Sequence, residues 1–177
     1  MSNSSKELRV RLELTPKDYF ASVKGLFNLL LPQLEIVESG TAEIVIRCQA
    51  ELKEKELMVE TELISSEAQL TLQEVDTILQ DPRYKKDDCK RRVKNKVKLQ
   101  IYQLLVDITP SSWGILVGMR PTKLVHMLLA KGFTVPEIRR KLKLEYGVAA
   151  DKIALLIKIV NQERSLLPAI NEQQPGV

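Results

Sequence analysis

The sequence is poor in the residue types that most often bind metals. It has two cysteines and one histidine among 177 residues. Cys48 and Cys89 lie far apart and have no metal-ligating neighbour at a suitable spacing, which is typical of free thiols in a reducing compartment. The histidine, His126, has no second histidine or carboxylate at ligand spacing, so we expect a boundary residue and not a catalyst. The sequence therefore predicts no metal site and no catalytic residue in this chain.

Long hydrophobic runs and aromatic residues are also scarce. No apolar run approaches the length of a membrane span, and the first residues, Met-Ser-Asn-Ser-Ser-Lys-Glu, contain no apolar stretch. We therefore expect a cytoplasmic protein without a membrane partner. Aromatic residues make up only 5% of the chain, so its core must consist mainly of leucine, isoleucine and valine.

Charge is distributed unevenly along the chain, although the net charge is only +4. Residues 35–81 include 12 acidic and 3 basic residues, whereas residues 83–143, here called the basic segment, include 16 basic and 4 acidic ones. This division favours one surface that binds anions. Nucleic acid, a polycarboxylate ligand and an acidic protein face are the candidates.

The first half, residues 1–82, has the pattern of strands with one helix. Leu8 to Leu14 alternate between apolar and charged residues, as in a half-buried strand. Thr15-Pro16 predicts a helix start, and Pro32 ends that helix. Further apolar alternation follows, with Ser39-Gly40 as a tight turn between two strands. We predict an α+β fold in which one helix covers a mostly antiparallel sheet.

The second half has helical periodicity. An apolar stripe predicts one long basic helix between Tyr84 and Ile108, within a linking region of residues 83–110. Residues 111–167 then predict a small three-helix subdomain, and residues 168–177 form a tail. In the last helix Leu155 and Ile159 lie opposite the main apolar stripe, which indicates a neighbour on each side: either a buried position or contact with a further domain or copy.

The segment Trp113–Lys123, WGILVGMRPTK, is unlike its surroundings. Pro121 favours a helix start, which leaves the Thr122 and Lys123 amides without intrahelical partners. Together with two cations, such amides can form an anion site. The candidate anion- or substrate-binding residues are Trp113, Gly118, Arg120, Thr122 and Lys123. The structural alternative is that the tryptophan fills a core corner, the glycines form turns and the arginine pairs with a carboxylate.

The same segment carries a family resemblance. Trp113-Gly-Ile-Leu-Val-Gly-Met-Arg-Pro-Thr-Lys-Leu-Val-His, followed by Leu-Leu-Ala-Lys-Gly, resembles the HemZ-type radical SAM proteins, which are similar to oxygen-independent coproporphyrinogen III oxidases (dehydrogenases). In that family a tryptophan-glycine, a glycine-x-arginine-proline and a lysine recur just upstream of the catalytic domain. The resemblance extends to about Leu167. Ser112 and Val117 depart from it, since the family usually has proline and threonine there.

The resemblance implies that this chain is an N-terminal accessory domain of a larger oxidoreductase of porphyrin and heme biosynthesis. Its parent would bind a [4Fe–4S] cluster and S-adenosylmethionine through a Cys-x-x-x-Cys-x-x-Cys loop, which this chain lacks. The tail at residues 168–177 would then lead to the catalytic domain. The implied partners are that domain in cis and an anionic porphyrinogen substrate.

A nucleic-acid-binding module is the alternative function. The long helix could follow phosphates, and the short helices after Pro121 could imitate a helix-turn-helix. Against it, no aromatic residues are interleaved with the basic ones, and the charge is mostly lysine on one helix. We therefore expect no nucleic-acid partner, and the basic face is then an ordinary solvated surface.

Overall fold

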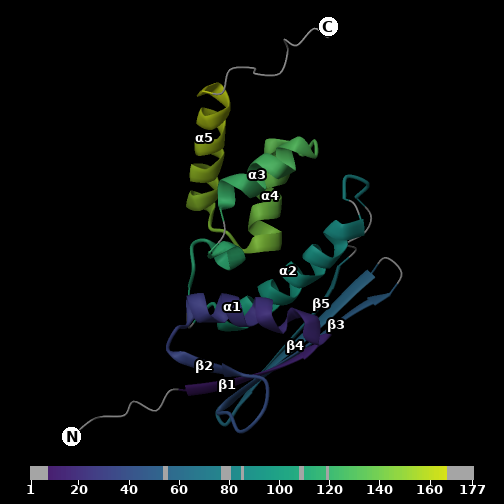
Figure 1. The fold of residues 1–177 in the computed structure, drawn as a ribbon, viewed down its shortest axis with the longest axis vertical. Helices are drawn as coiled ribbons and strands as arrows, with labels where there is room; N and C mark the ends of the chain where they lie inside the picture. Colours follow the sequence, from purple (N-terminus) through teal and green to yellow (C-terminus); the bar gives the residue numbers. More distant parts are fainter. Residues whose placement is uncertain are drawn as a thin grey trace, which may run out of the picture.

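A computed structural model describes residues 8–53, 56–76, 81–84, 86–107, 110–118 and 120–166 of the chain. It contains one five-stranded sheet with the order β2-β1-β3-β4-β5. The strands are β1 (Leu8–Thr15), β2 (Leu34–Val37), β3 (Ile44–Lys53), β4 (Glu56–Ser65) and β5 (Gln69–Asp76). Helices follow in the second half, so the predicted α+β class and the order of sheet and helices are confirmed (Figure 1).

The pairing of the strands is mixed. β1 is parallel to both of its neighbours, β2 and β3, whereas β3–β4 and β4–β5 are antiparallel. The predicted tight turn at Ser39-Gly40 does not join adjacent strands, because β2 and β3 lie on opposite sides of β1. Residues 38–43 cross β1, and Arg11 Nη1 donates to the Gly40 carbonyl at 2.8 Å. Apolar alternation predicts strands but does not determine which strands are neighbours.

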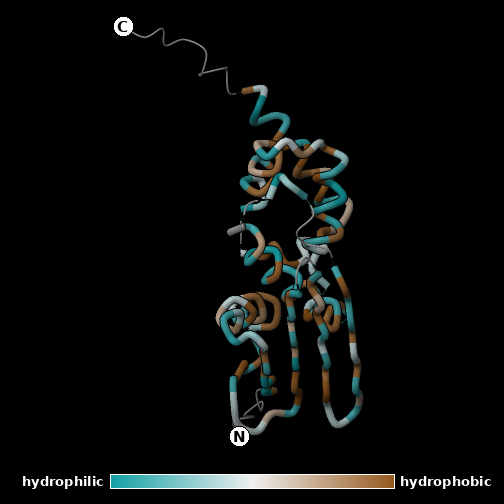
Figure 2. The backbone as a smooth tube through the Cα atoms, turned by 90° about the vertical axis from the view of Figure 1, so that its right-hand side faces the viewer, coloured by the Kyte–Doolittle hydropathy of each residue, from teal (hydrophilic) through white to brown (hydrophobic). Residues whose placement is uncertain are grey.

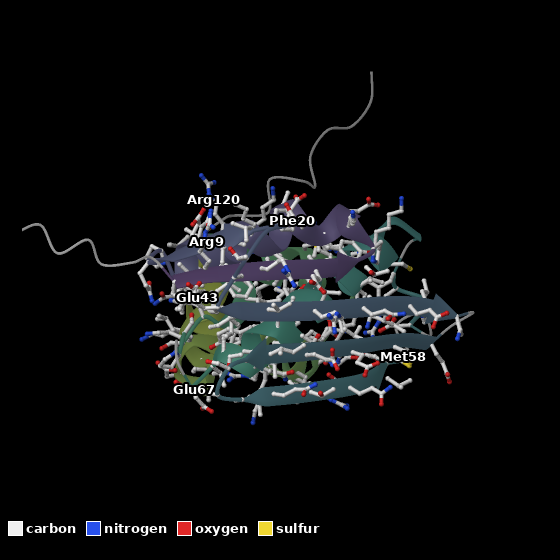
Figure 3. The ribbon with its side chains drawn as sticks, turned by 90° about the horizontal axis from the view of Figure 1, so that it is seen from below. Arg9, Phe20, Glu43, Met58, Glu67 and Arg120 are labelled. Carbon is white, nitrogen blue, oxygen red and sulfur yellow. The ribbon has the colours of Figure 1, made fainter. Side chains whose placement is uncertain are left out.

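Two helices cover one face of the sheet, where the sequence predicted one. A 3₁₀ turn (Lys17–Tyr19) and α1 (Phe20–Leu30) follow β1, so Thr15 ends the strand instead of capping a helix. The second helix is α2 (Lys86–Leu105), a shorter version of the predicted long helix. Side chains of α1, α2 and the sheet form the first hydrophobic core. The opposite face of the sheet carries no helix among the described residues (Figure 3).

The helical half consists of a 3₁₀ turn (Gly114–Leu116), α3 (Pro121–Ala130), α4 (Val135–Tyr146) and α5 (Ala150–Leu166). Its local signals agree with the sequence analysis. Pro121 begins α3, Thr134 and Glu137 form a capping box, and Gly147 ends α4 with a φ of +68°. Figure 2 shows the two halves stacked along the long axis of the molecule. No helix in the described ranges combines the length and apolar character needed to cross a membrane.

α2 contributes to both halves. The predicted stripe is buried against the sheet through Val93, Val97 and Ile101. Leu99 and Tyr102, on another side of the helix, belong to a second core that is formed mainly by α3, α4 and α5. The sequence analysis found only the first of these two faces, because the second is interrupted by polar and basic residues.

Candidate functional site

The segment Trp113–Lys123 links α2 to α3 and packs tightly at its start. Gly114 is buried and has a φ of +54°. A Cβ at this position would lie 2.0 Å from the carbonyl oxygen of Tyr146 and 2.6 Å from Gly147. Only glycine fits here, so the segment is fixed against the C-terminal end of α4.

Trp113 is half-buried and packs against the second core. The ammonium group of Lys152, from the first turn of α5, lies 5.9 Å from the centroid of the indole ring, a distance typical of a cation–π contact. The tryptophan therefore borders the N-terminal end of α5. This position agrees with the structural alternative, in which the ring fills a corner of the core.

Gly118 has a φ of +75°, and a Cβ there would lie 2.8 Å from Leu29 Cδ1 of α1. The close approach that glycine permits is thus an approach to α1. It brings the start of α3 to the C-terminal half of α1, in the sheet half of the molecule. Leu29 itself is 55% exposed.

Arg120 and Lys123 are exposed at the first turn of α3, and Thr122 between them is half-buried. Arg120 stands at the N-cap with an extended backbone, followed by Pro121 at the first helical position. Figure 3 shows Arg120 extending away from the ribbon. Within the part of the chain that the structure describes, neither cation has a carboxylate partner. Two free cations beside open helix amides can bind a carboxylate or phosphate group.

His126 has a partner that the sequence analysis missed. Its Nε2 lies 2.7 Å from Glu163 Oε2, and this pair connects α3 to α5. Both side chains are partly exposed. The two residues are 37 positions apart, so no local spacing rule could have paired them.

Several basic residues of the basic segment form ion pairs with carboxylates of the same molecule. Arg83 binds Asp81 at 2.8 Å and Glu137 at 2.9 Å, and its guanidinium lies 3.7 Å from the centroid of the Phe133 ring. The hydrogen bonds with Asp81 and then Glu137 raise the pKa of Arg83. The hydrogen bond from Arg83, with those from Thr134, lowers the pKa of the Glu137 carboxyl to about 2.

Other basic residues of this segment also have acidic partners within the molecule. Arg92 contacts Glu145 at 3.8 Å, and Lys96 reaches Glu74 and Asp76 on β5. Further pairs are Arg91–Asp88, Lys131–Asp88 and Lys141–Glu145. Lys98 is partly buried, and this burial, with the nearby Lys94, lowers its pKa. The basic helix is therefore not the uniformly solvated cationic face that the sequence suggested.

Cys48 lies in the first core, where burial raises the pKa of its thiol to about 11, although a hydrogen bond with Thr61 at 3.1 Å partly opposes this. A neutral buried thiol is a poor nucleophile. Among the described residues no group of three or more His, Cys, Asp or Glu side chains could hold a metal ion.

Comparison with known proteins agrees with the resemblance predicted from Trp113–His126. No protein-family model matches the chain. The oxygen-independent coproporphyrinogen-III oxidase-like protein HemZ of Bacillus subtilis (strain 168) is 27% identical to it over 151 residues. The match covers 82% of this chain and 29% of HemZ. The resemblance to HemZ-type proteins is thus confirmed, and the chain spans less than a third of the length of this relative.

Proposed function

We propose that this chain is the N-terminal accessory domain of a radical SAM oxidoreductase related to the oxygen-independent coproporphyrinogen III oxidases. The observation that carries the proposal is the similarity to HemZ, which includes 82% of this chain but only 29% of the relative. Catalysis then belongs to the remaining part of a longer cytoplasmic polypeptide that acts in porphyrin and heme biosynthesis.

The cluster and S-adenosylmethionine do not fit the residues of this chain. A [4Fe–4S] cluster of this class needs three cysteines on one loop, whereas Cys48 lies in β3 and Cys89 in α2. We therefore assign both groups to the catalytic domain and derive no chemical step from the residues present here.

An exposed apolar stripe on α5 supports contact with that domain. Leu155 is 43% exposed and Leu166 is 79% exposed, and Ile159 lies one turn from Leu155 on the same side of the helix. Leu156 and Val160, on the opposite side, are buried in the second core. The catalytic domain would cover the exposed stripe and so remove apolar surface from water.

The first turn of α3 supports a role in receiving an anionic substrate. A porphyrinogen carries carboxylates, and a guanidinium matches carboxylate geometry with two parallel hydrogen bonds. Arg120 and Lys123 are exposed and lack acidic partners among the described residues. Their task would be to attract and orient the substrate, not to react with it.

The test uses the longer polypeptide that contains this chain. Its reading frame beyond Val177 should encode the three-cysteine loop. With coproporphyrinogen III, S-adenosylmethionine, a one-electron reductant for the cluster and an electron acceptor for the substrate radical, the reconstituted protein should form 5′-deoxyadenosine, methionine, CO2 and a decarboxylated product. Absence of either the loop or the product refutes the proposal.

Arg120→Ala in that polypeptide tests the substrate role. Loss of a charge-assisted hydrogen bond should raise KM for the porphyrinogen about tenfold, while the melting temperature of the 177-residue chain stays unchanged. Arg140→Ala removes an exposed arginine of α4 and serves as the control with unchanged KM. A lower melting temperature with unchanged activity per folded molecule would make Arg120 purely structural.

A further inference from the structure

The sheet has a vacant strand position beside the second half of β1. β2 pairs with β1 only from Leu8 to Arg11, although β1 continues to Thr15. β2 stops at Val37 because the chain then turns and crosses β1. The edge of β1 from Leu12 to Thr15 therefore has no strand on its β2 side among the described residues.

The backbone direction of β1 shows which groups are open on that edge. The Arg9 amide donates to the carboxylate of Glu43, which directly precedes β3, so this amide points toward β3. Backbone polar groups alternate sides along a strand. Leu12 and Leu14 consequently present their N–H and C=O groups to the vacant side. Buried or half-buried backbone groups of this kind favour a hydrogen-bonding partner.

A cleft occupies the vacant position. It has a volume of about 340 Å³, and Leu12, Leu14 and Phe20 are among its lining residues. Figure 3 views the open face of the sheet and shows Phe20 at the sheet margin opposite Glu67. A strand placed here would direct alternate side chains toward α1 and its Phe20, in the same way as Ile36 of β2 is directed into the first core.

Two unpaired charges mark the ends of the cleft. Glu38 lies at the end where β2 stops, and Lys17 lies where β1 ends. Both are exposed, and neither has an ion pair within the described ranges. The other two charged residues of the lining, Glu13 and Arg47, already bind each other at 3.0 Å. A ligand strand would therefore match the cleft with a basic residue near Glu38 and an acidic residue near Lys17.

We infer that this cleft binds an extended peptide segment of a partner protein, which adds to the sheet as a continuation of β2. Recognition by strand addition takes affinity from backbone hydrogen bonds and specificity from alternate side chains. The vacant length from Leu12 to Thr15 accommodates a core of four residues, or about 13 Å at a rise of about 3.3 Å each. One basic residue near Glu38 precedes these four, so the matching sequence is basic, β-branched, polar, β-branched, acidic.

The experiment titrates the ¹⁵N-labelled 177-residue chain with the peptide acetyl-Lys-Val-Thr-Val-Glu-amide and follows amide signals by NMR. The Leu12 and Leu14 amides should shift, and at saturation their hydrogen exchange should slow about tenfold, as expected for one new hydrogen bond each. The same peptide N-methylated at the threonine and the glutamate lacks the donors that would face β1, because in a parallel pair the core-facing valines direct their own amides away from it, and it should leave these amides unchanged.

Charge variants test the direction of the strand. Glu38→Lys should weaken binding of this peptide, and the double variant Lys17→Glu with Glu38→Lys should prefer acetyl-Glu-Val-Thr-Val-Lys-amide. All these positions are exposed, so the melting temperature should not change. Glu67→Lys, at the opposite margin of the sheet, is the matched control and should bind as the unaltered chain does.

Four results would overturn the inference. The first is that the Leu12 and Leu14 amide signals do not shift at about 5 mM peptide, a concentration at which even millimolar affinity gives binding. The second is that the shifts are concentrated on β5, and the third is that the N-methylated peptide binds equally well. The fourth is that the signals of the same two amides disappear through self-association, which would make a second copy of the chain the occupant.

Discussion

At Gly114 the backbone of a neighbouring turn leaves no room for a side chain. Gly132 also has a positive φ, +81°, but a Cβ there would meet nothing within 4 Å. Gly132→Ala should therefore lower the free energy of unfolding by only about 1 kcal/mol, the cost of a positive φ for a residue with a side chain. Gly114→Ala adds a clash with Tyr146 and Gly147, so its loss should be larger by at least about 1 kcal/mol. Urea unfolding of both variants measures the difference, and equal losses would contradict it.

The sequence predicted which residues belong to the candidate site, but not which distant residues they contact. The sequence marked Trp113–Lys123 through its glycines, its proline and its cations, and the structure places Arg120 and Lys123 together on the first turn of α3. It could not show that Gly118 faces Leu29 or that His126 meets Glu163. Those contacts join distant parts of the chain, and local patterns carry no information on them. The anion-binding role remains a prediction.

Among the elements, α2 is joined to the sheet by a buried amide in addition to its apolar contacts. Gln100 is 1% exposed; its Nε2 donates to the Val59 carbonyl at 2.9 Å, and its Oε1 accepts from the Thr61 hydroxyl at 2.7 Å. Gln100→Leu would remove the side-chain donor to the Val59 carbonyl and leave the Thr61 hydroxyl with Cys48 Sγ as its side-chain partner, and should lower the free energy of unfolding by about 2–3 kcal/mol. Gln103→Leu, at an exposed position of the same helix, should change it by less than about 0.5 kcal/mol. Equal effects in chemical denaturation would show that the amide network contributes little.

The start of α4 should give the molecule a specific acid sensitivity. Contacts with Arg83 and Thr134 lower the pKa of Glu137 to about 2, from 4.5 for the free side chain. Because the folded pKa is the lower one, the stabilisation is complete above pH 4.5 and disappears as the pH falls toward 2.

Glu137→Gln should therefore melt at a lower temperature than the unaltered chain at pH 6, and the two should converge near pH 2. Glu67→Gln, at an exposed position, supplies the control without this behaviour. A difference in melting temperature that stays constant between pH 6 and pH 2 would contradict the assignment. Thermal melts across this range provide the measurement.

Periodicity predicted which residues form each element but not which elements are neighbours. β1, α1 and α4 were expected within a few residues of their observed bounds, because alternation, proline and capping act locally. The central position of β1 and the second buried face of α2 were missed. Both depend on contacts between distant segments, and Gln100 reads in the sequence as one more polar residue of a basic helix.

For the whole molecule, the internal ion pairs predict weak attraction to nucleic acids. Arg83, Arg92 and Lys96 bind acidic residues of the same chain, so fewer cations are available to replace counterions on phosphates. Anisotropy measurements with labelled random duplex DNA should show negligible binding at about 0.15 M salt, where charges are screened beyond about 8 Å. Micromolar affinity that falls steeply with added salt would instead favour the nucleic-acid-binding alternative.

The position of α2 between two cores has a thermodynamic consequence. Val97 and Ile101 belong to the core with the sheet, whereas Leu99 and Tyr102 belong to the core with α3, α4 and α5. If either half unfolded alone, it would expose the side of α2 that it covers, although the other half still packs on the opposite side of this helix. Unfolding of the two halves is therefore cooperative. Native-state hydrogen exchange should give the same opening free energy for the slowest amides of β4 and α4. A bound partner that stabilises the helical half against unfolding should therefore also stabilise the sheet, because both halves pack on α2.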